Sequence, residues 1–159
     1  MATNKELLLE VNRQIVSDVK LIYRPKVKMC ERPLVKCSED AYRLFLDSWD
    51  MDTICLAEQS RLMLLNNARR VLGIMLLSQG GITGTVIDPR IVFLAALQAG
   101  ATCIHLAHNH PSMRLEPSGN DKALTAKIKE AGAFLDIHLE DHLIISPDGY
   151  YSMADEGIL

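Results

Sequence analysis

Three of the five histidines, His105, His108 and His110, lie within six residues. Side chains two residues apart point to the same side of an extended chain, so His108 and His110 can present their imidazoles to one point in space. Imidazole nitrogen is a preferred zinc ligand, and a catalytic zinc site uses three protein ligands and leaves the fourth position to water. His105 falls on the opposite face, where we expect a core residue or one that supports a ligand. The spacing therefore predicts a pair of metal ligands.

The natural third ligand is Asp121, because Ser118-x-x-Asp121 opens the next predicted helix a short loop away. Two histidines and one carboxylate would leave one position of a zinc ion open. Each piece also has an ordinary explanation. Ser-x-x-Asp is an acidic version of the helix capping box, and a carboxylate in the first turn of a helix is stabilised by the helix dipole without any metal. On these residues alone, both interpretations stay open.

Capping residues, proline and glycine predict where the helices and strands that position these residues begin and end. Asp88-Pro89 and Gly100 predict the ends of a helix over 90–99, whose apolar composition suggests that it is buried. Residues 101–107 are predicted to form a central strand that delivers the histidines to its C-terminal end, where α/β proteins commonly place chemistry. Ser118 is predicted to cap the next helix, which we expect to end at Gly132.

The remaining elements suggest an α/β fold. Ser38 looks like the N-cap of a helix over 39–50, and apolar runs at 62–65 and 71–77 are predicted to be antiparallel strands. Strands are also expected over 135–152, with a turn at Pro147-Asp148-Gly149. Helices and strands that alternate in this way predict a three-layer α/β domain with a mixed sheet.

Length and composition describe an ordinary globular protein. The 159 residues are 48% hydrophobic and 23% charged, which is typical of one domain. The net charge of −3 provides no field that attracts phosphate backbones, so we expect no direct nucleic-acid binding. No apolar run reaches the roughly 20 residues that cross a bilayer, and four cysteines without CxxC spacing suggest reduced thiols. We expect a cytoplasmic protein, in which residues 1–35 form an extension that packs on a domain over 36–159.

The order His108-x-His110-x7-Ser118-x-x-Asp121 matches the full pattern of JAMM metallopeptidases. From about residue 58 onward, the chain resembles the bacterial RadC-like branch of that family, with further matches in His108-Asn109-His110-Pro111-Ser112, Asp141-His142-Leu143-Ile144-Ile145 and Tyr151-Ser152. The resemblance implies a three-layer α/β/α JAMM/MPN (cytidine-deaminase-like) fold. It also implies one zinc ion per chain, held by His108, His110 and Asp121, and hydrolysis of an amide in a peptide or isopeptide substrate.

The same resemblance suggests roles for other residues. Glu58, ahead of the first core strand, matches the general acid/base, although a solvated loop glutamate describes it equally well. Ser118 would stabilise the oxyanion, and we expect its hydroxyl to cap the helix and to serve the reaction at different moments. We interpret Asp141 and His142 as a structural hydrogen-bonded pair, or as one that supports a metal ligand, rather than as catalytic groups.

Two departures from the RadC-like pattern bear on function. Met113 stands where the branch generally has glycine, and the chain has no room for the N-terminal helix-hairpin-helix region of longer relatives. A DNA-associated accessory protein of repair or mobile elements and a non-catalytic MPN scaffold are the alternatives to a hydrolase. Scaffolds of this kind typically lose metal ligands, whereas this chain has the full set. The sequence leaves the substrate and any homo-oligomer open.

Overall fold

A single mixed sheet forms the middle of the molecule. The computed structural model describes residues 22–24, 26–82 and 84–159, so residues 1–21 of the extension expected over 1–35 lie outside the described residues. The strands are β1 (Gln59–Leu65), β2 (Val71–Gln79), β3 (Cys103–Asn109), β4 (His138–Ser146) and β5 (Gly149–Ser152). Their order is β2-β1-β3-β4-β5, and β3 and β4 are parallel while the other neighbours are antiparallel.

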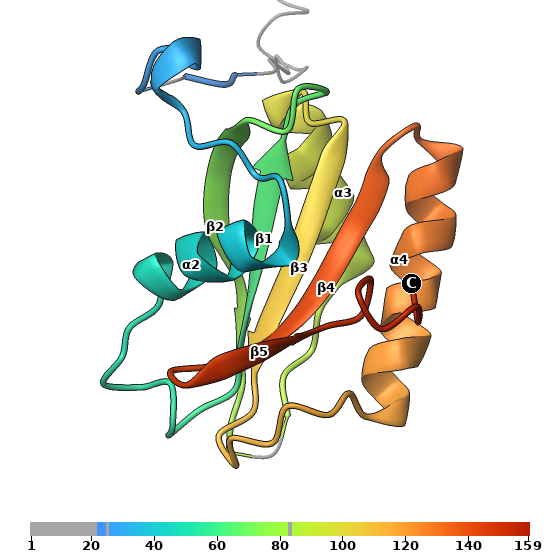
Figure 1. Ribbon diagram of the computed structural model, residues 1–159. Coiled ribbons are helices and arrows are strands. Elements are labelled where there is room, and N and C mark those ends of the chain that lie inside the picture. The colour runs from blue at the N-terminus through green and yellow to red at the C-terminus, as the bar shows by residue number, and fades with distance from the viewer. Residues whose placement is uncertain (1–21, 25, 83) are drawn as a thin grey trace, which may run out of the picture.

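Helices cover both faces of this sheet. They are α2 (Ser38–Ser48), α3 (Pro89–Ala99) and α4 (Gly119–Phe134). A short 3-10 helix, η1 (Met29–Glu31), has no buried residue and does not belong to these layers. Figure 1 shows α2 in front of the sheet and α3 and α4 behind it. The predicted three-layer α/β architecture with a mixed sheet is therefore confirmed.

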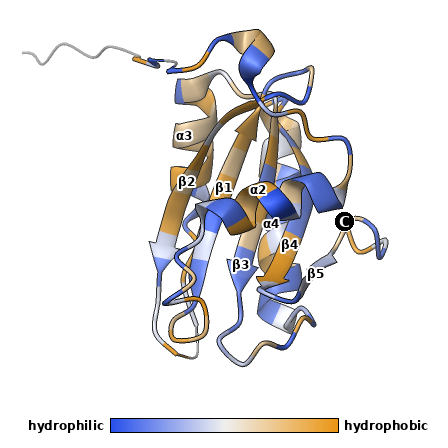
Figure 2. Cartoon of the chain, turned by 60° about the vertical axis from the view of Figure 1, so that its left-hand side comes forward, coloured by the Kyte–Doolittle hydropathy of each residue, from blue (hydrophilic) through white to orange (hydrophobic). Residues whose placement is uncertain are grey.

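The core consists of two layers separated by β3, whose seven residues are all buried. Cys103 and Ala107 pack with α2, whereas Ile104 and Leu106 pack with α3 and α4. Alternation along one strand thus fills both cores, as expected for a central strand. Figure 2 shows the strands largely hydrophobic along their length and more hydrophilic at the end where β3 stops, so polar side chains gather at that end.

Three local predictions are wrong for physical reasons. α2 begins at Ser38, and the Ser38 hydroxyl donates to Asp155 at 2.5 Å instead of capping the helix. α3 is not fully buried, because it lies in an outer layer that can place only one side against the sheet; its exposed face carries Leu94 and Leu97, which are 61% and 56% exposed. α4 runs past Gly132 to Phe134, since Gly132 serves close packing rather than helix termination.

Several other predictions agree with the structure. The capped helix after Asp88 ends at Gly100, which has a φ of 65°, and the two antiparallel strands β1 and β2 lie where expected. The four cysteines are free. Among the described helices, none combines the length and apolar character needed to span a membrane. The boundary proposed between residues 35 and 36 stays a prediction.

Candidate metal centre

His108 and His110 converge at the C-terminal end of β3. His108 is the penultimate residue of the strand and His110 follows its last residue, so both imidazoles emerge on the α4 side. Their Nε2 atoms lie 3.0 Å apart. The Nδ1 atom of His110 donates to the carbonyl oxygen of Arg114 at 2.7 Å, because a carbonyl can only accept. That bond leaves Nε2 of neutral His110 as a free lone pair facing His108.

Asp121 approaches the histidines from the first turn of α4. Its Oδ1 lies 3.4 Å from His108 Nε2, and its Oδ2 lies 3.7 Å from His110 Nε2. The capping box fixes this carboxylate, since Ser118 N–H donates to Asp121 Oδ2 at 2.7 Å and Asp121 N–H donates to Ser118 Oγ at 3.2 Å. The capping and metal-binding interpretations of Ser-x-x-Asp are therefore compatible, because one carboxylate serves both.

The three side chains fit a small tetrahedral cation. Ligand atoms about 2.0–2.1 Å from a tetrahedral zinc ion lie about 3.3 Å from one another. The two Nε2 atoms lie 3.0 Å apart, and they lie 3.4 and 3.7 Å from Oδ1 and Oδ2 of Asp121 respectively, so the contacts are close to that value. With one ligand atom taken from each residue, all three lie within 4.8 Å of one another. Two neutral imidazoles cannot hydrogen-bond through two bare Nε2 atoms, so a cation between them would relieve their repulsion. His108, His110 and Asp121 could therefore hold a metal ion.

Electrostatics favour a cation at this point. Burial acts to raise the pKa of Asp121, but contacts with the imidazoles of His108 and His110, which favour the ionised carboxylate whenever an imidazole carries a proton on Nε2, outweigh it and hold that pKa far below its usual range. When His110 takes up a second proton, its Nε2 faces Asp121, and this interaction is the main reason that the pKa of His110 is raised. The carboxyl group is thus ionised at neutral pH, and a metal ion and a proton compete for the same imidazole.

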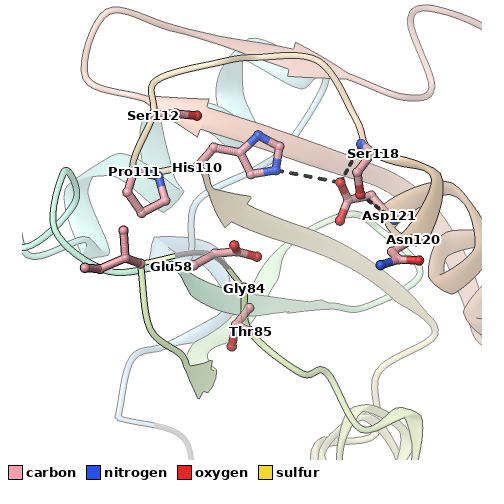
Figure 3. A pocket seen from close by; sticks show the side chains of 10 residues that line it. Glu58, Gly84, Thr85, His110, Pro111, Ser112, Ser118, Asn120 and Asp121 are labelled. Atoms are coloured by element: carbon pink, nitrogen blue, oxygen red, sulfur yellow. Dashed lines mark hydrogen bonds and ion pairs between the residues drawn. The ribbon is translucent and has the colours of Figure 1, made fainter.

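Glu58 lies across a cavity from these ligands. The cavity measures about 390 Å³, and its lining includes Glu58, Thr85, His110, Ser118 and Asp121. Figure 3 shows the carboxylate of Glu58 directed toward the space in front of His110 and Asp121. Glu58 comes immediately before β1, and its main chain is held by hydrogen bonds with Gly80 and Gly81. The structure thus brings the predicted acid/base residue to the same hollow as the predicted ligands.

Asn109, between the two histidines, is a residue whose role the sequence analysis missed. It is fully buried, and its Oδ1 accepts from Gln59 N–H at 2.7 Å. Its Nδ2 donates to the carbonyl oxygens of Ile54 and Ala57 at 2.6 and 2.9 Å. These three bonds tie the segment on both sides of Glu58 to the strand that carries the histidines. The sequence did contain one indication of this role, because Asn109 is a polar residue between two predicted metal ligands.

Ser118 lines the cavity from the N-terminus of α4. Its Oγ accepts from Asp121 N–H, which uses a lone pair and leaves the hydroxyl proton available. The expectation that capping and oxyanion stabilisation must alternate in time is therefore wrong, since one hydroxyl can accept and donate at once.

The other polar residues singled out in the sequence lie on opposite faces of the sheet. His105 lies on the α2 side, where Nε2 contacts Glu140 Oε2 at 3.3 Å, so it does not join the metal centre. Asp141 and His142 are hydrogen-bonded to each other as predicted, although through the main chain of His142 rather than between the two side chains. Asp141 accepts from the main chain of His142 and from Ser152 Oγ, whereas the His142 imidazole contacts His108 Nδ1 at 2.8 Å. Burial holds the pKa of His142 well below its ordinary value, so this imidazole is neutral.

Comparisons with known proteins agree with this arrangement. A family model described as RadC-like JAB domain matches residues 35–158. A UPF0758 protein of Flavobacterium johnsoniae is 50% identical over 101 residues, which are 64% of this chain and 44% of the relative. A UPF0758 protein of Porphyromonas gingivalis is 38% identical over 136 residues, which are 85% of this chain and 59% of the relative. The chain thus spans about half the length of these curated relatives. Since the family match covers most of its residues, the chain belongs to the RadC-like JAB domain family.

Proposed function

We propose that this protein is a metal-dependent hydrolase that holds one zinc ion on His108, His110 and Asp121 and cleaves an amide bond in a peptide or isopeptide. The observation that carries the proposal is that one ligand atom from each of His108, His110 and Asp121 lies within 4.8 Å of the other two, beside a cavity lined by a carboxylate from another element. A catalytic zinc site needs this combination of three protein ligands and an accessible side.

Each side chain has a task in such a reaction. When bound, zinc would polarise the substrate carbonyl and lower the pKa of a water molecule to about 7. Glu58 accepts a proton from the attacking water and delivers it to the leaving amine as the carbon–nitrogen bond breaks. Ser118 O–H donates to the carbonyl oxygen as negative charge develops on it. Asn109 keeps the Glu58 segment in register with the ligands.

The first test is the metal content of the purified protein, measured by elemental mass spectrometry. We expect about one zinc per chain in the wild type and loss of that zinc in the His108→Ala, His110→Ala double variant. His105→Ala is the matched control, because it removes a buried imidazole of the same strand from the opposite face. If the wild type takes up no metal after incubation with zinc, the proposed hydrolase is contradicted and the non-catalytic scaffold is the remaining alternative.

The substrate class requires a second measurement. A peptide mixture and isopeptide-linked peptides are incubated with the zinc-loaded protein, and new termini are identified by mass spectrometry. We expect cleavage by the wild type and none by the double variant. A zinc-loaded protein that cleaves neither class would contradict the proposed reaction while leaving the metal site intact.

A further inference from the structure

A chain of buried hydrogen bonds runs from the back of His108 to the main chain of Asp121. His108 Nδ1 lies 2.8 Å from His142 Nε2, and His142 Nδ1 lies 2.6 Å from Thr125 Oγ1. Thr125 Oγ1 in turn lies 2.6 Å from the carbonyl oxygen of Asp121, one helical turn earlier in α4. All four residues are buried or partly buried, so solvent does not offer ready substitute partners.

The direction of each bond follows from counting protons. The Asp121 carbonyl can only accept, so the single hydroxyl proton of Thr125 points to it; the Met153 thioether, 3.4 Å away, is a weaker acceptor. The contact between Thr125 and His142 must then use the Nδ1 proton of His142. A neutral imidazole carries one ring proton, so His142 Nε2 is an acceptor. His108 must therefore donate through Nδ1.

The directions of these hydrogen bonds determine which nitrogen of His108 faces the candidate metal centre. A neutral His108 that donates through Nδ1 has its lone pair on Nε2, which is the atom 3.4 Å from Asp121 Oδ1. The opposite tautomer would place a proton where a metal ion must bind. Metal-binding histidines generally need their other ring nitrogen engaged in this way.

The same bonds also link two ligands that come from different elements. His108 belongs to β3, His142 to β4 and Thr125 to α4, whose first turn carries Asp121. The hydrogen-bonded path thus begins at the imidazole of one ligand and ends at the main chain of another. A polar pair that only filled the core would not need to start and end at metal ligands.

We propose that His142 and Thr125 are positioning residues that hold His108 in the tautomer with a free Nε2 and set its distance from Asp121. This inference rests on the proposed function, since it assigns these residues to the same metal site. Neither residue touches the substrate cavity, whose lining includes neither His142 nor Thr125.

The test is a cobalt(II) titration followed by visible absorption, with a competing chelator to determine affinity. Thr125→Val removes the hydroxyl, and His142→Leu removes the acceptor for His108. We expect each to weaken metal binding about 10- to 100-fold. His142→Gln should bind more tightly than His142→Leu, because an amide oxygen can accept from His108 Nδ1–H. Circular dichroism establishes that each variant is folded.

Matched controls separate positioning from general loss of packing. Thr102→Val makes the same chemical change just before β3, and His105→Gln replaces a buried imidazole on the other face. Both should bind cobalt like the wild type. Equal affinity of Thr125→Val, His142→Leu and the wild type would overturn the inference while leaving the metal site in place. A wild type that binds no metal would overturn the proposed function and this inference together.

A second readout observes the tautomers directly. In zinc-loaded protein labelled with ¹⁵N-histidine, NMR should find His108 and His142 both protonated on Nδ1. Thr125→Val should change the His142 signals and leave those of His105 unchanged. A wild-type His142 protonated on Nε2 would contradict the proposed direction of the bonds.

Discussion

At the scale of single residues, the role of Glu58 can be separated from that of the metal ligands. Glu58→Gln keeps the size of the side chain and the main-chain hydrogen bonds of residue 58, but the amide cannot accept a proton. We expect the hydrolysis rate to fall about 10²- to 10⁴-fold with zinc content unchanged, because Glu58 lines the cavity without being one of the three ligands. Elemental analysis and turnover are measured on the same sample. An unchanged rate in this variant would assign the acid/base role elsewhere.

A second residue-scale prediction concerns the other face of the sheet. The hydrogen bond from His105 is the main reason that the pKa of Glu140 lies below its ordinary value of 4.5, and Arg69 contributes. A lowered folded-state pKa stabilises the protein above 4.5, and that stabilisation is lost as pH falls through the lower value in the folded protein. Urea unfolding should show Glu140→Gln less stable than the wild type by about 1 kcal/mol at pH 7. The difference should disappear in acid, and a constant difference would contradict the assignment.

At the scale of elements, the loop between β3 and α4 contains a strained residue. Met113 has a φ of 60°, in the left-handed region that favours glycine. The conformation costs a non-glycine residue about 1–2 kcal/mol, and the greater freedom of unfolded glycine offsets about half of it. Met113→Gly should therefore raise the free energy of unfolding by about 0.5–1 kcal/mol. Ser112→Gly, without a positive φ, should lower it. A less stable Met113→Gly variant would show that the methionine side chain contributes more than the strain costs.

The packing of α4 gives the opposite prediction for another glycine. A Cβ at Gly132 would lie 2.3 Å from the carbonyl oxygen of Ile137, which is main chain and cannot rotate away. Gly132→Ala should therefore destabilise the protein by about 1–3 kcal/mol, although alanine is the better helix former. Gly119→Ala is the control, because no atom within 4 Å would meet its Cβ. Denaturant unfolding of both variants decides the point; equal stabilities would mean that α4 moves freely relative to β4.

At the scale of the whole molecule, the proposed zinc ion joins β3 to α4. A ligand that binds only the folded state stabilises it by about 4 kcal/mol at 1,000 times its Kd, which corresponds to a Tm shift of about 10 °C for a chain of this size. We expect a chelator to lower the Tm by that order and added zinc to restore it. The His108→Ala, His110→Ala variant should show no chelator effect. If the chelator leaves the Tm of the wild type unchanged, the protein does not hold a metal ion tightly.

The spacing of the site residues and most of the elements that carry them could be predicted from local patterns in the sequence. His-x-His at the end of an apolar run, followed by Ser-x-x-Asp, is a local pattern. Such patterns can be interpreted from the sequence because the periodicity of a strand or helix determines which side chains share a face. The capped helix after Asp88 and the strand hairpin were predictable for the same reason. The resemblance carried by these residues also predicted the layered fold.

The contacts between segments that are distant in the sequence became visible in the tertiary structure alone. Glu58 and Asp121 are far apart in the sequence, and their approach to one cavity depends on β1 pairing with β3 while α4 packs behind the sheet. The sequence analysis missed the roles of Asn109 and Thr125 and did not foresee the side-chain partners of His142. A hydrogen bond between distant elements leaves no periodic signal in the chain. Helix α3 was predicted to be buried because hydrophobicity does not reveal which side of an outer helix meets the sheet. Packing made that choice, since one layer of helices can bury only the face turned toward the strands.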